Sequence, residues 1–231
     1  MSLDYAKHKS IMLQILKDIY TDTNVAPYLG FKGGTAAMLF YGLPRYSVDL
    51  DFDLLDETKK EGVFKRVKEI CASYGMVEHS IIKRYSILNI ISYAPGTQKI
   101  KIEINRRNLG SSYVPKTLLG ITMLVMTKED MFANKIMAMV ERIGKTSRDI
   151  FDVYYFFKEG WDINKSLVEK RANKQYKEVL ETCLKLLGKT DNRHILDGLG
   201  EILTDKQKDW ARSKLKEETI FLIKIAIEQA S

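Results

Sequence analysis

The chain has 231 residues, of which 45% are hydrophobic, with a formal net charge of +7 and a sequence pI near 9.1. Its two cysteines, Cys71 and Cys183, form no CxxC pair, which argues against a disulfide framework or a zinc knuckle, and no apolar run approaches the roughly 18 residues that span a bilayer. We therefore expect a soluble, cytoplasmic protein with a hydrophobic core of ordinary size. Its excess of positive charge fits binding to the phosphates of nucleotides or nucleic acid, and it fits equally a role in solubility alone.

The first part of the chain predicts a mixture of helices and strands. Apolar residues recur at helical spacing near the start, and short apolar runs bounded by glycine or aspartate follow. Asp56 can cap a helix that Gly75 ends. The predicted elements are, in order, a helix over 3–20, a strand over 29–32, a helix beginning at 33–35, a strand over 48–52, a helix after Asp56, and two strands over 76–85 and 86–93.

A further strand, residues 99–105, has the clearest alternation in the chain, with three isoleucines on one face. One more apolar run, residues 117–126, leads to the helix-entry signature T-x-x-D at Thr127, and Ser147 can cap another helix. The remainder predicts helices. The sequence thus predicts an α+β fold, with a mixed-sheet domain over 1–120 and a helical domain over 121–231.

The strand after residue 47 carries acids on one side. Asp49, Asp51 and Asp53 alternate with apolar residues, so the carboxylates should share one face while the apolar face enters the core. Such carboxylates repel one another unless a cation lies between them, and Mg²⁺ is held by oxygen ligands of this kind. Glu103, on a second alternating strand, can bring a third acid to the same patch. Asp53 lies at the strand end, where a capping or surface role suits it as well as metal binding.

A glycine pair precedes the acids. Gly33 and Gly34 allow the backbone to come close to a phosphate, Thr35 can add a hydroxyl donor, and the N-terminus of the following helix attracts anions. Taken singly, the glycines suit an ordinary tight turn, and the acids suit a solvated edge strand. Together they outline a nucleoside triphosphate site.

These motifs resemble those of the AbiEii/MenT-type nucleotidyltransferases, toxins of type IV toxin–antitoxin and abortive-infection systems within the polymerase-β-like superfamily. The resemblance spans residues 31–154. The matching segments are K-G-G-T-A at 32–36, Y-G-x-x-R-x-S-x-D-L-D-F at 41–52, Glu103, Lys135 on a helix, and R-D-x-x-D-x-Y at 148–154.

The resemblance implies a site of catalytic, metal-binding and nucleotide-binding residues. The superfamily often has Asp where Glu103 stands here. The implied Mg²⁺ ligands are Asp49, Asp51 and Glu103; the further catalytic residues are Lys135 and Asp149; the nucleotide-binding residues are Gly33, Gly34, Thr35, Arg45 and Ser47.

The residues alone leave two of these assignments open. Lys135 borders a core-facing stripe, so its ammonium could simply reach solvent. Asp149 lies in a first helical turn, where an acid also favours the helix dipole.

The expected function is Mg²⁺-dependent transfer of a nucleoside monophosphate from an NTP to an RNA acceptor, the 3′ end of tRNA, which would block translation. The expected protein partner is a cognate antitoxin, and no association with a membrane is expected. Two alternatives stay open: nucleotidylation of a protein hydroxyl, and a non-catalytic nucleotide- or RNA-binding protein.

Overall fold

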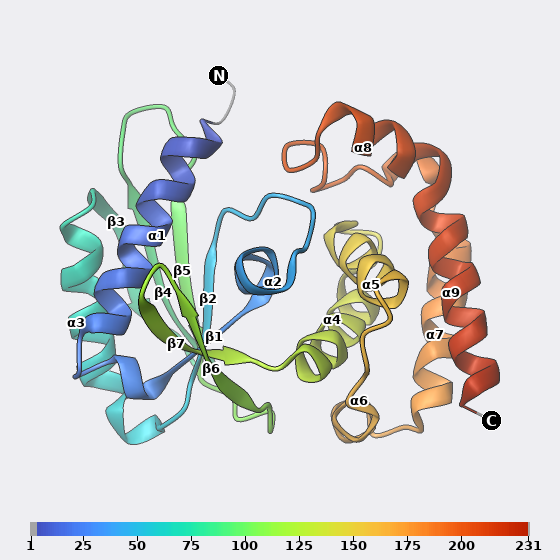
Figure 1. The fold of residues 1–231 in the computed structure, drawn as a ribbon, viewed down its shortest axis with the longest axis horizontal. Helices are drawn as coiled ribbons and strands as arrows, with labels where there is room; N and C mark the ends of the chain where they lie inside the picture. The colour runs from blue at the N-terminus through green and yellow to red at the C-terminus, as the bar shows by residue number, and fades with distance from the viewer. Residues whose placement is uncertain (1–3, 231) are drawn as a thin grey trace. The chain divides into compact units, whose positions relative to one another are not determined.

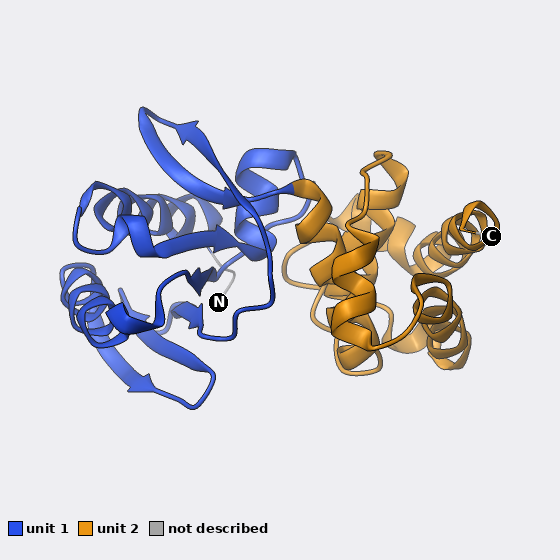
Figure 2. Ribbon diagram, turned by 90° about the horizontal axis from the view of Figure 1, so that it is seen from below, with its two compact units in different colours: residues 1–127 blue, residues 128–231 orange. Residues whose placement is uncertain are grey.

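The computed structural model describes residues 4–230, and the chain divides into two compact units (Figure 2). The first unit ends at Thr127 and the second begins at Lys128. This boundary lies later than the predicted residue 120. The reason is that residues 121–126 form a strand of the first unit's sheet and do not open the helical part.

The first unit is built on one mixed sheet of seven strands in the order β3-β4-β5-β2-β1-β7-β6. Strand β2 runs parallel to β5, and β1 runs parallel to β7, while the other neighbouring pairs are antiparallel. The predicted mixed sheet is thereby confirmed. The strands are β1 Leu29–Lys32, β2 Leu50–Leu54, β3 Met76–Ile82, β4 Ser86–Ser92, β5 Ile100–Asn105, β6 Tyr113–Leu118 and β7 Ile121–Met126.

Helices α1 (Tyr5–Thr21) and α3 (Lys60–Ala72) lie together on one side of this sheet (Figure 1). The ring of Phe52 on β2 lies 6.3 Å from that of Tyr20 on α1, and Phe52 is fully buried. The apolar face of β2 therefore meets the helices. Because side chains alternate along a strand, the acids of β2 face the other way. Helix α2 (Gly33–Tyr41) follows β1 directly.

Two features of the sheet differ from the sequence prediction. Strand β2 begins at Leu50, so Asp49 lies in the segment before it rather than within it. The apolar run over 117–126, for which the sequence analysis gave no turn, contributes to the β6–β7 hairpin, because the backbone turns at Leu119 and Gly120, whose φ angles are 51° and 77°.

The second unit is helical, as predicted. Its core includes the rings of Phe132, Phe156 and Trp161, with Trp161 stacked on Phe156 at 3.9 Å. Ser147 occupies the N-cap position of α5 but does not cap the helix, because its hydroxyl donates to the carbonyl of His194. The helices are α4 Lys128–Arg142, α5 Arg148–Lys158, α6 Lys165–Ala172, α7 Tyr176–Lys189, α8 Asp205–Trp210 and α9 Lys216–Gln229, with a π-helical turn at Ala211–Leu215.

Across residues 4–230, no helix combines the length and the apolar character that crossing a membrane would require.

Candidate active site

The junction of β1 and α2 brings the chain backbone against the acidic strand. Gly33 has a φ of +80°, in the left-handed region, and a Cβ at this position would lie 2.5 Å from Oδ2 of Asp51. A Cβ at Gly34 would lie 2.7 Å from Nη2 of Arg45 and 2.9 Å from Oγ of Ser47. Only glycine fits both places without displacing those side chains. Gly33, Gly34, Arg45 and Ser47, which were predicted to bind the nucleotide, thus lie together with Asp51.

The first turn of α2 has the character of an anion site. Lys32, at the N-cap position, provides no side-chain capping bond, and the first N–H groups of a helix have no partner within it. Such groups, with the helix dipole, favour phosphate.

Thr35 makes a structural hydrogen bond that the sequence did not predict. Its side chain is 1% exposed, and its hydroxyl donates to the carbonyl oxygen of Asp49 at 2.5 Å. This bond fixes the segment that enters β2, and the contact of Thr35 with a phosphate stays a prediction. Thr35 thereby sets the position of the Asp49 backbone.

The acids of β2 and β5 are neighbours, as the alternation predicted. Asp51 and Glu103 are register partners in the parallel β2–β5 pair, and both are half-buried. Burial raises the pKa of Asp51; the ammonium of Lys101 opposes this shift, and the negative charges of Asp49 and Glu103 add to it. Asp51 thus lies where its negative charge is costly without a nearby cation.

Lys101 is a resident cation in this acid cluster, and the sequence reasoning did not identify it. Its Nζ lies 2.8 Å from Oε2 of Glu103. Burial alone would raise the pKa of Glu103, but the bond from Lys101 holds it below its usual range. The pKa of Lys101 is raised in turn, because attraction by Glu103, Asp51 and Asp49 outweighs its own burial. The spacing of residues 101 and 103 on one strand face was the available signal.

The acids fit a divalent cation in part. Within the described residues, no group of three or more histidine, cysteine or acidic side chains is arranged to hold a metal ion. Glu103, predicted as the third ligand, is instead paired with Lys101. Asp49 and Asp51 are the other two predicted oxygen ligands, and Mg²⁺ is usually held by one or two carboxylates together with substrate phosphates.

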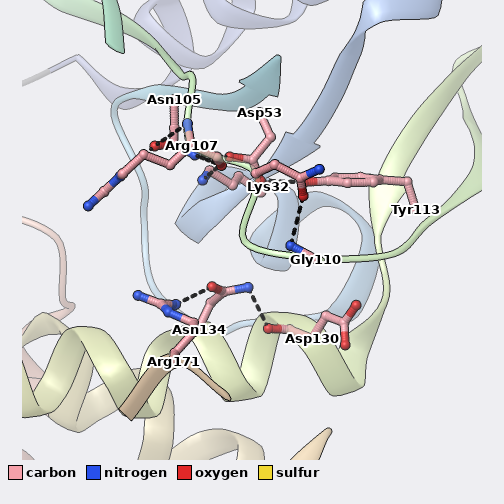
Figure 3. Close-up of polar contacts among 10 residues, drawn as sticks. Lys32, Asp53, Asn105, Arg107, Gly110, Tyr113, Asp130, Asn134 and Arg171 are labelled. Carbon is pink, nitrogen blue, oxygen red and sulfur yellow. Dashed lines mark hydrogen bonds and ion pairs between the residues drawn. The ribbon is translucent and has the colours of Figure 1, made fainter. Parts of the chain in front are cut away.

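Asp53 lies next along the acidic face and is the centre of a buried polar cluster (Figure 3). Its side chain accepts from Lys32 Nζ at 2.6 Å, from Asn105 Nδ2 at 2.5 Å and from the hydroxyl of Tyr113. Asp53 is 7% exposed, so its role is to hold these groups in place. It fixes Lys32, the residue immediately before the glycine pair.

The second unit contains its own cluster of charged residues, at α4 and α5. Lys135 Nζ lies 3.1 Å from Oδ1 of Asp149 and 2.7 Å from Oδ2 of Asp152, and both acids are almost fully buried. Arg142 Nη2 lies 2.8 Å from the Asp149 carboxylate. Lys135 therefore does not extend into solvent, and Asp149 does more than favour a helix dipole. Asp152 and Arg142 were not predicted, although the R-D-x-x-D spacing placed Asp152 on the same helix face.

A second polar network of this unit also escaped prediction (Figure 3). Asn134 donates to the carbonyl of Asp130 at 2.8 Å and accepts from Arg171. Asn164 donates to the Asp130 side chain at 2.5 Å. Because Asp130 is 2% exposed, these bonds satisfy a buried acid and tie α6 to α4.

The structure resembles two solved proteins of Helicobacter pylori. One, to which a nucleotidyltransferase activity has been ascribed, superposes with a TM-score of 0.66 at 21% sequence identity, covering 100% of this chain and 97% of the other. The second, JHP933, gives a TM-score of 0.65 at 20% identity, covering 100% and 94%. At this identity the likeness concerns the fold. No protein of curated function matches the sequence.

The sequence itself matches a family model over residues 14–219, described as the nucleotidyl transferase AbiEii toxin of type IV toxin–antitoxin systems. The match covers most of the chain and includes both clusters of charged residues. A nucleotide substrate and an antitoxin partner belong to this family's description. The chain is a nucleotidyltransferase enzyme and belongs to the AbiEii family of toxins.

Proposed function

We propose that the protein transfers a nucleoside monophosphate from an NTP to an RNA acceptor, the 3′ end of tRNA, with Mg²⁺ as cofactor. One observation carries the proposal: the Gly33 backbone at the start of α2 lies against Asp51, and Asp51 is in register with Glu103. A helix N-terminus suited to phosphate thus adjoins a carboxylate suited to a hard cation, and a second carboxylate, which Lys101 holds, lies beside it.

In the proposed reaction, the acceptor hydroxyl oxygen forms a bond to the α-phosphorus. The bond from that phosphorus to the bridging oxygen breaks, pyrophosphate leaves, and the hydroxyl loses its proton. The N–H groups at the start of α2 would hold the triphosphate, with Arg45 and Ser47 beside Gly34. Asp49 and Asp51 would hold Mg²⁺, which when bound supplies charge neutralisation at the reacting phosphate. Catalysis would rest on positioning and electrostatics.

Lys101 would act on this site by holding Glu103. With Lys101 at 2.8 Å, Glu103 is kept ionised and its carboxylate is fixed. We also assign Lys135 and Asp149 to the reaction, on the strength of the family pattern, with Asp152 as the residue that fixes Lys135.

The RNA acceptor is supported by the chain's net charge of +7, which favours association with a polyanion. Modification of tRNA ends would disable translation and account for toxicity. A cognate antitoxin would then control the activity.

The test is a reaction of the purified protein with each of four labelled NTPs, Mg²⁺ and either total RNA, purified tRNA or cell protein, resolved on gels. We expect label in the tRNA band with one preferred NTP and none without Mg²⁺. Asp51→Asn should abolish labelling, whereas Asp209→Asn, at an exposed ion pair of α8, should not. Label confined to protein would overturn the RNA acceptor. Equal growth arrest by the wild-type chain and Asp49→Ala would favour a non-catalytic binding protein.

A further inference from the structure

The turn between β3 and β4 presents an aromatic ring beside two arginines. Tyr85 is 51% exposed. The guanidinium carbon of Arg84 lies over this ring at 4.9 Å from its centroid, and that of Arg107, just beyond β5, lies over it at 5.7 Å. Both arginines are exposed. We call these three residues the aromatic–arginine platform.

Hydrogen bonds hold the platform in place. The N–H of Arg106 donates to the carbonyl of Tyr85 at 2.9 Å, and its guanidinium donates to the carbonyls of Lys83 and Arg84 at 2.7 and 3.2 Å. Arg106 also pairs with Glu57. One arginine thus fixes the whole turn, so little ordering is left to occur when a ligand binds.

A second set of bonds connects the platform to the acidic face of the sheet. Arg107 Nε donates to Oδ1 of Asn105 at 3.1 Å, and Asn105 donates to Asp53 at 2.5 Å (Figure 3). Asn105 and Glu103 share one face of β5 because they are two residues apart. The platform therefore continues the acidic face beyond the end of β5.

The order of groups along the sheet matters for the reaction. Lys32 is the register partner of Asp51, so Gly33 adjoins the start of β2, whereas Asp53 and Asn105 are partners near its end. Asn105, the last residue of β5, lies two residues beyond Glu103, about 7 Å along the strand, and Arg107 follows it by two residues. The α2 N-terminus and the platform thus lie toward opposite ends of the strands that carry the acids. In an in-line displacement the attacking and leaving groups also lie on opposite sides of the phosphorus.

We propose that the aromatic–arginine platform binds an unpaired base, with its flanking phosphates, near the reacting end of a single-stranded acceptor RNA. This rests on the proposed function and adds the surface that receives the acceptor. A tyrosine face stacks on any base, and exposed arginines pair with phosphates. Exposed Lys83 in the same turn extends the positive surface.

The test measures RNA binding without NTP or metal. Anisotropy of a fluorescein-labelled single-stranded RNA dodecamer would be titrated with the full chain in EDTA. Tyr85→Ala should weaken binding about 5- to 150-fold, whereas Tyr85→Phe, which keeps the ring, should bind nearly as the wild type. Arg107→Gln should weaken binding and lower its salt dependence. Phe221→Ala removes an aromatic residue of α9 that is 62% exposed, more than Tyr85, and should change nothing.

If Tyr85→Ala binds the RNA as tightly as the wild type does, the proposed role of the platform is wrong. It is also wrong if the wild-type protein binds the dodecamer and a blunt RNA duplex equally tightly, because the duplex offers no unpaired base. Loss of protein labelling with unchanged RNA affinity in Tyr85→Ala would also reject it, in favour of a protein partner. The two proposals fail differently. If Tyr85-dependent RNA binding persists but no labelled NTP reaches RNA, the proposed function fails; if RNA is labelled but binding ignores Tyr85, the platform fails.

Discussion

The backbone of Gly33 lies against the carboxylate of Asp51 so closely that a Cβ on Gly33 would come within 2.5 Å of Oδ2. The glycine that begins the phosphate-suited helix therefore also sets where the β2 acid lies. Any side chain there would move the acid or the helix start.

Gly33→Ala should accordingly lose both stability and activity. Alanine in the left-handed region costs about 1–2 kcal/mol, and the displaced Asp51 should lower nucleotidyl transfer about 100-fold or more. Urea denaturation and the labelled-NTP assay measure the two effects. Gly62→Ala is the control, because a Cβ there meets nothing within 4 Å inside α3, so the variant should gain about 0.5–1 kcal/mol. Full activity in Gly33→Ala would refute the steric argument.

Much of the fold could be predicted because periodicity is a local property. The alternation of Ile100, Ile102 and Ile104 predicted β5 and the face of Glu103, and the structure places Glu103 beside Asp51. The hairpin at Leu119 was missed, since a leucine with positive φ gives no turn signal of its own.

The polar contacts of the site could not be predicted to the same extent, because they join distant parts of the chain. Tyr113 bonds Asp53 across 60 residues of sequence, and the Thr35 hydroxyl is used by the Asp49 carbonyl. Such pairings depend on strand order, which no local pattern encodes. Lys101 is the exception. Its position two residues before Glu103 already placed it on the acidic face.

Lys135→Met should strongly destabilise the second unit. It would leave Asp152 and Asp149 buried without the ammonium that lies 2.7 and 3.1 Å from them. Removing one partner of a buried ion pair typically costs about 3–5 kcal/mol. Adding Asp152→Asn to this variant should recover part of the loss, because one uncompensated charge disappears. Urea denaturation at pH 7.5 measures both.

The matched control for Lys135→Met is Lys208→Met, which removes a lysine from an exposed ion pair with Asp205. It should leave the unfolding midpoint unchanged. A comparably small effect of Lys135→Met would mean that the two buried acids do not need its charge.

Asp51→Asn should stabilise the metal-free protein while abolishing transfer. Burial raises the pKa of Asp51, so its charged form is less favourable in the folded state than in the unfolded chain. The cost of that charge is absent below the unfolded pKa, grows as pH rises through the window up to the folded pKa, and is complete above it. The midpoint of thermal unfolding of Asp51→Asn should therefore exceed that of the wild type at pH 7.5, and the two should converge near pH 3.5.

Thermal unfolding of the wild type and of Asp51→Asn should also be measured with added Mg²⁺. The ion should raise the wild-type midpoint at pH 7.5, because a ligand that binds only the folded state stabilises it. Asp51→Asn should show little response. A variant that is less stable than the wild type in EDTA would contradict the cost of burying the Asp51 charge, and a variant that responds equally to Mg²⁺ would contradict the assignment of Asp51 as a metal ligand.

Lys101→Met should make the protein more dependent on divalent metal. Without the ammonium, Glu103 and Asp51 keep their mutual repulsion but lose the cation that offsets it. We expect the metal-free protein to lose about 1 kcal/mol, since the Lys101–Glu103 pair is partly exposed. Mn²⁺, followed by electron paramagnetic resonance, should bind about tenfold more tightly because a competing positive charge has gone. Lys99→Met is the control, because Lys99 lies just before β5 and pairs with Glu78 rather than with an acid of this cluster. If both variants bind Mn²⁺ as the wild type does, Lys101 does not act on the acid cluster, and Glu103 would have to be assigned a role independent of metal binding.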